Sequence, residues 1–132
     1  MPKWTTMRLM VADLLLSIIL IFFPFQAEAK RYKFDCTYSQ YASPEGPKNV
    51  DGFKLEFHFD DITGKAVLIG NSGVSDVDAH AGNLAVTFMK ELNDGVVQTT
   101  TITNDGSSIH SRHSIVTDKI IPSQYYGRCL IE

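Results

Sequence analysis

The two cysteines of this chain, Cys36 and Cys129, constrain its fold more than any other feature. They lie near opposite ends of the segment that follows an apolar N-terminal stretch. The sequence has no Cys-x-x-Cys pair or cysteine–histidine cluster that would suggest a metal site. In a small exported domain two thiols usually form a disulfide, which requires Cα atoms within about 7 Å of each other. The pairing therefore predicts that the beginning and the end of the domain lie together.

The first 29 residues have the composition of a cleavable signal peptide. Basic residues precede an apolar stretch over 14–25, and Ala27 and Ala29 provide the small side chains of a cleavage site. Asp13 leaves this stretch shorter than the about 20 residues of a membrane-spanning helix, which disfavours the alternative of a single-pass anchor. We expect cleavage after Ala29, a periplasmic or secreted location, and no stable membrane anchor in the mature domain, 30–132.

The mature domain consists of alternating polar and apolar segments separated by turn signals, without an amphipathic helix pattern. In the clearest segment, 53–59, four apolar residues share one face. Two Asn-Asp-Gly sequences, 93–95 and 104–106, favour hairpin turns because glycine tolerates positive φ. The expected strands are 31–38, 53–59, 65–70, 74–79, 84–92, 96–103, 108–116 and 124–131.

The short connections between these strands predict an all-β fold of about eight antiparallel strands in an up-and-down meander. Cys36 and Cys129 both lie among apolar residues on one face of their strands, so they are expected in the interior. Their disulfide would make the first and last strands neighbours and close a small barrel without exposed edges. A β-sandwich, in which the two strands face each other across a thin core, is the alternative.

Such a barrel is similar in architecture to the lipocalins, although the chain is shorter than typical members and has none of that family's sequence motifs. The one long connection, 39–52, contains two prolines and two glycines and is expected to be a loop. If the barrel binds a ligand at its mouth, this loop would act as the lid.

Composition and motifs exclude several classes of function. The net charge is −3, and removing 1–29 leaves it unchanged because two basic and two acidic residues are lost together. A mildly acidic domain without a basic stripe disfavours nucleic-acid binding. The sequence has neither a Gly-rich phosphate loop nor a Gly-x-Ser-x-Gly elbow, so it predicts no cofactor and makes an enzyme improbable. Asp76, Asp78 and His80 share a strand face that we expect to be wet and metal-free.

The segment His110–Ser111–Arg112–His113 concentrates the polar residues most suggestive of a site. Residues three apart on a strand point to opposite sides, which disfavours a two-histidine metal site. The apolar neighbours at 109 and 115 predict that Ser111 and His113 face inward and that His110 and Arg112 face outward. The ordinary structural explanation is a hydrogen-bonded interior histidine with a solvated exterior pair.

Two hypotheses of function follow. In the first, the protein is a non-catalytic module that binds a small apolar or amphipathic ligand at the barrel mouth, oriented by Ser111, His113 and Tyr125. In the second, it is a structural or inhibitory partner of another exported protein in the periplasm or extracellular space. The surface for that partner would include His110, Arg112 and Tyr126, because tyrosine and arginine are enriched at binding hot spots.

Overall fold

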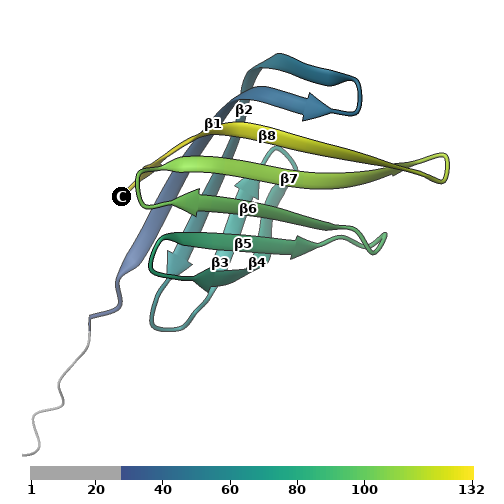
Figure 1. The fold of residues 1–132 in the computed structure, drawn as a ribbon. Helices are drawn as coiled ribbons and strands as arrows, with labels where there is room; N and C mark the ends of the chain where they lie inside the picture. Colours follow the sequence, from purple (N-terminus) through teal and green to yellow (C-terminus); the bar gives the residue numbers. More distant parts are fainter. Residues whose placement is uncertain (1–27) are drawn as a thin grey trace, which may run out of the picture.

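The structure, a computed structural model, describes residues 28–132 as one closed antiparallel barrel of eight strands in sequence order (Figure 1). Most of the predicted signal peptide, 1–27, lies outside the described residues. Within 28–132 no helix has the length and apolar character needed to cross a membrane. The predicted all-β barrel is confirmed, and the sandwich alternative is wrong. The strands are β1 (Arg31–Ser43), β2 (Gly46–Asp60), β3 (Ala66–Gly70), β4 (Gly73–Ala81), β5 (Ala85–Glu91), β6 (Val97–Thr103), β7 (Ser107–Val116) and β8 (Lys119–Ile131).

The interior is filled by the apolar faces of these strands. In β2 the alternation places Leu55 and Phe57 in the core and leaves His58 exposed. Phe57 stacks on Phe88 of β5 with ring centroids 4.5 Å apart, although β2 and β5 are not neighbours in the barrel. This contact therefore crosses the interior and closes the middle of the barrel.

The first and last strands form the seam that closes the barrel. β1 pairs with β8 from Phe34, opposite Ile131, to Ala42, opposite Gln124. Within this pairing Cys36 lies directly opposite Cys129, with Cα atoms 3.9 Å apart, and the two form a buried disulfide. The prediction of interior cysteines on neighbouring strands is confirmed.

The prediction of a loop over 39–52 is wrong. β1 continues to Ser43 and β2 begins at Gly46, so only Pro44 and Glu45 lie in the turn (Figure 1). A register shift between Tyr38 and Gln40 allows β1 to bend and to keep its pairing with β2. Proline is tolerated in β2 at position 47 because β3 pairs with β2 only from Glu56 onward, which leaves this part of β2 as an edge.

The closeness of the seam gives a prediction about Gly127 of β8. A Cβ atom at this position would overlap the Thr37 carbonyl oxygen and lie 2.7 Å from the Tyr38 Cα atom. Because these are backbone atoms, β1 would have to move. We expect Gly127→Ala to lower the free energy of unfolding by about 3 kcal/mol in urea denaturation.

The matched control is Gly82→Ala, where the nearest atom to the new Cβ would be the Ala85 carbonyl oxygen at an ordinary 3.6 Å. Equal stability of the two variants would contradict the close approach of β1 and β8.

Candidate functional site

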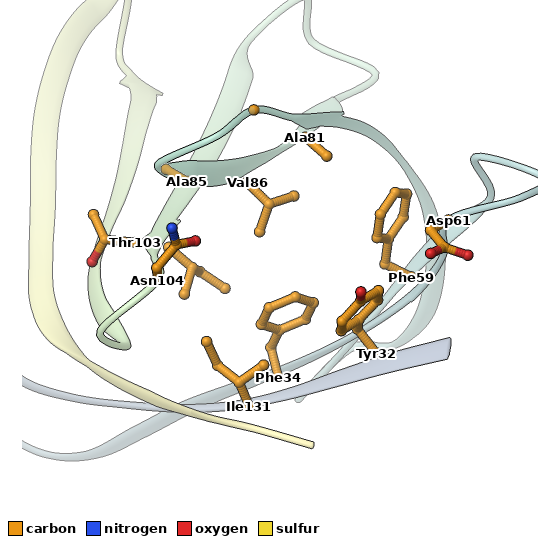
Figure 2. Close-up of a pocket in the computed structure, with 12 residues that line it drawn as sticks. Tyr32, Phe34, Phe59, Asp61, Ala81, Ala85, Val86, Thr103, Asn104 and Ile131 are labelled. Atoms are coloured by element: carbon orange, nitrogen blue, oxygen red, sulfur yellow. The ribbon is translucent and has the colours of Figure 1, made fainter. Parts of the chain in front are cut away.

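One end of the barrel contains an apolar cavity of about 360 Å³, here called the mouth pocket (Figure 2). It lies where β1 begins and where β2 and β8 end. This is the end opposite the β1–β2 and β7–β8 turns (Figure 1). The apolar side chains that line it are Tyr32, Phe34, Phe59, Ala81, Ala85, Val86, Ile102 and Ile131.

The walls of the mouth pocket follow from the strand alternation. Tyr32 and Phe34 are two residues apart on β1 and point to the same side, and Phe59 stacks on Tyr32 from the adjacent β2. Deeper in the barrel, Phe88 packs edge-on against Phe34 and Phe59, with centroids 5.5 and 6.4 Å away. The rings are thus held by the filled core below them. In Figure 2 Val86 and Ile131 complete the walls around the space.

The rim of the mouth pocket is polar. Asn104 donates a hydrogen bond to the Asn83 carbonyl oxygen at 2.9 Å, and Thr103 donates to the Ser107 carbonyl oxygen at 3.0 Å. Asp61, the one acidic residue of the lining, is exposed and accepts a hydrogen bond from the Lys30 backbone nitrogen at 3.1 Å. The arrangement accommodates an apolar body inside and a polar group at the rim.

A separate polar network lies deeper in the barrel. His110 is only 3% exposed, and its Nδ1 atom lies 2.7 Å from the Thr100 hydroxyl. The Tyr38 hydroxyl, fully buried, is 3.0 Å from the Ser108 hydroxyl. Within residues 28–132 every buried side-chain nitrogen or oxygen has a hydrogen-bond partner. Satisfied networks of this kind stabilise one arrangement of a core.

The environment keeps both titratable members of this network neutral at pH 7. Burial, together with the positive charge of Arg112, lowers the pKa of His110 to about 4. Burial raises the pKa of Tyr38 to about 12, against the opposing hydrogen bonds with Ser108 and Thr100. The network therefore brings no charge into the interior.

The predicted orientation of the segment 110–113 is wrong. His110 faces inward, whereas Ser111 and His113 lie on the outer face, where they line a hollow of about 650 Å³ over β6–β8. The apolar residues Ile109 and Ile115, which were expected to face the core, are exposed instead. Alternation alone allows either face of β7 to point inward, so contacts with other strands determine which one does. The His110 imidazole is held inside by its hydrogen bond with Thr100 and by packing against the Tyr38 ring.

The other three predicted site residues lie in different surroundings. Tyr125 faces inward, as expected, and packs on Phe53 and Tyr41 with centroids 4.6 and 4.9 Å away. Arg112 is exposed, while Tyr126 is half-buried and donates a hydrogen bond to Gln124 Oε1 at 2.6 Å. The structure therefore does not unite Ser111, His113 and Tyr125 in one site. It places none of the three in the mouth pocket.

Acidic and histidine side chains on the outer surface do not form a metal site in the part of the chain that the structure describes. Asp76, Asp78 and His80 are exposed along β4, as predicted for a wet strand face.

Comparison with protein-family models, with curated proteins and with solved structures finds no match to this chain. The fold and the pocket themselves define the class: a small, disulfide-closed, eight-stranded antiparallel β-barrel with an apolar pocket at one mouth.

The buried imidazole predicts a distinct pH dependence of stability. The unfolded chain binds a proton at His110 near pH 6.5, whereas the folded chain does so only near pH 4. The contribution of neutral His110 to the free energy of unfolding is therefore fully present above pH 6.5. It falls as the pH is lowered toward 4, by about 3 kcal/mol in total. We expect His110→Gln to flatten the free energy of unfolding between pH 6.5 and 4 in urea titrations.

The control is His113→Gln, because this histidine is exposed on the same strand. An unchanged pH slope in His110→Gln would show that His110 is not buried in the neutral form.

Proposed function

We propose that the protein is an exported, non-catalytic binding module that holds a small apolar or amphipathic ligand in the mouth pocket. The observation that carries the proposal is the volume of about 360 Å³ that eight apolar side chains leave open at one end of the barrel. Pockets for small molecules have volumes of about 300–1,000 Å³ and mainly apolar walls. The disulfide supports export, since such bonds persist in oxidising compartments.

The rim favours a ligand with a hydrogen-bond donor at one end. The Asp61 carboxylate oxygen that does not accept from Lys30 and the side-chain oxygen of Asn104 supply acceptors there, and the side chains of the walls below are apolar apart from the Tyr32 hydroxyl. A neutral or cationic amphiphile would place its apolar body among the aromatic rings and its polar end toward solvent.

The position of the pocket changes which segment can control access. The β1–β2 hairpin, which contains the segment 39–52, has its turn at the opposite end of the barrel (Figure 1). It cannot act as a lid on the mouth pocket. Access is instead bordered by the β2–β3 and β4–β5 connections, which contribute Asp61 and Gly82.

A pocket-filling variant tests the proposal. Val86 points into the cavity, so Val86→Trp should occupy the space that a ligand would use (Figure 2). We expect the native protein to bind the neutral fluorescent amphiphile N-phenyl-1-naphthylamine with a Kd on the order of 10–100 µM. Binding should weaken at least tenfold in Val86→Trp.

The matched control is Val74→Trp, because Val74 is 68% exposed on β4 and outside the pocket. Equal binding by native protein and both variants, or no binding by any of them, would contradict the proposed site. Native mass spectrometry of the exported protein would identify a ligand that co-purifies.

A second candidate, interaction with another exported protein, is favoured by one feature of the surface. The tip of the β7–β8 hairpin extends beyond its neighbours, because β6 pairs with β7 only as far as Arg112 and β1 pairs with β8 only from Gln124. Within the described chain, both edges of this tip are therefore open. Its apolar side chains are exposed: Ile115, Val116, Ile120 and Ile121. Open edges and apolar side chains are features of strand-addition interfaces.

Pull-down from a periplasmic extract tests this candidate. If the hairpin tip binds a partner, Ile120→Ser should abolish its recovery, since Ile120 is 71% exposed and would be buried by contact. Ile62→Ser, at an equally apolar residue in the β2–β3 turn, is the control. Recovery of the same partner by Ile120→Ser would exclude the tip as the interface.

A further inference from the structure

The segment that precedes β1 is attached to the rim of the mouth pocket by a reciprocal pair of hydrogen bonds. The Lys30 backbone nitrogen donates to Asp61 Oδ1 at 3.1 Å, and the Asp61 backbone nitrogen donates to the Lys30 carbonyl oxygen at 3.2 Å. The Lys30 ammonium also lies 4.9 Å from the centroid of the Tyr32 ring, which lines the pocket. Lys30 is thus held at three points immediately before the first strand.

Lys30 is also the residue that export is expected to turn into the N-terminus. Hydrolysis of the Ala29–Lys30 peptide bond adds one water: Ala29 leaves with a new carboxylate, and Lys30 retains a primary amine that is protonated at pH 7. The donor that faces Asp61 would then change from an amide with one N–H to an ammonium with three. Hydrogen bonds between charged groups are about twice as strong as those between neutral ones.

We propose that Asp61 is the binding site for the N-terminal ammonium created when the chain is cleaved after Ala29. The inference rests on the export that is part of the proposed function, but it does not depend on whether the mouth pocket binds a ligand.

The neighbouring carboxylate, that of Asp60, forms hydrogen bonds within the β2–β3 turn. Asp60 Oδ1 accepts hydrogen bonds from the backbone nitrogens of Ile62 and Thr63, each at 3.0 Å, and its Oδ2 lies 3.8 Å from Arg31. The carboxylate of Asp61, the next residue, instead accepts a hydrogen bond from the Lys30 backbone nitrogen. The two adjacent acids therefore have different tasks: Asp60 shapes the β2–β3 turn, and Asp61 receives the chain end.

The consequence is a processed terminus that forms part of the pocket rim. Chain ends normally fray unless a specific contact holds them. Here the ion pair would keep Lys30 beside Tyr32, at the entrance to the mouth pocket. Cleavage would thereby complete the entrance as well as release the domain.

The test measures how fast the N-terminal amine reacts with a limiting acylating reagent at pH 7. The protein is expressed with residues 1–29, purified from the periplasm and mapped by peptide mass spectrometry. An ammonium held by Asp61 has less free amine to react, so Asp61→Asn should accelerate N-terminal labelling about two- to threefold, the size expected for an exposed ion pair. Asp51→Asn, at an exposed carboxylate near the other end of β2, should leave the rate unchanged.

The labelling rate of Lys119, in the distant β7–β8 hairpin, serves in each sample as an internal reference for the reagent concentration and for folding. Denaturing the native protein in urea should remove the protection and provides a second measure that needs no variant. Equal N-terminal rates in native protein and Asp61→Asn would overturn the inference. A mature chain that begins at a residue other than Lys30 would also overturn it. A chain that keeps residues 1–29 would overturn the export on which both proposals rest.

Discussion

The pairing of the first strand with the last determines the rest of this structure. Seven hairpins could leave β1 and β8 as open edges, but their hydrogen bonds and the Cys36–Cys129 disulfide join them instead. Backbone hydrogen bonds of 2.9 Å in both directions between Lys33 and Glu132 continue the seam to the end of the chain. Closure therefore pairs the edges of β1 and β8 that would otherwise invite aggregation along the barrel wall. It also brings the two ends of the domain to one mouth of the barrel.

The side chains that fill the interior differ along the barrel axis. The stacked rings of Phe57 and Phe88 fill the middle, and the polar network around His110 and Tyr38 is fully hydrogen-bonded. The mouth beside the chain ends leaves apolar volume between its walls. Stability and binding can thus reside in different parts of one small core, so a ligand need not displace the side chains that hold the barrel together.

The sequence predicted the local elements well because their signals are local. Alternation in β2 and the two Asn-Asp-Gly turns lead directly to the strands and hairpins observed. The interior position of Cys36 and Cys129 followed from their apolar neighbours and, with their pairing, implied closure. The prediction of a loop over 39–52 fails because proline and glycine usually interrupt strands. Position 47 can lie in a strand because β3 does not pair with this part of β2, which leaves it as an edge.

The candidate site was less predictable because it depends on contacts distant in sequence. The phase of β7 is decided by whether His110 finds Thr100 across the sheet, and the exposed isoleucines on the same strand indicated the opposite phase. The mouth pocket combines Tyr32, Val86 and Ile131 from three separate strands. Alternation shows that each can face inward, but which end of the barrel stays unfilled depends on the sizes of all the interior side chains together.

Peptide mapping of the exported protein, alkylated and digested without reduction, tests the central claim most directly. If β1 and β8 close the barrel as described, the two cysteine-containing peptides are recovered as one covalently linked species, and reduction separates them. Recovery of Cys36 and Cys129 as two alkylated, unlinked peptides from folded protein would contradict the covalent seam and, with it, the mouth at which the chain ends meet.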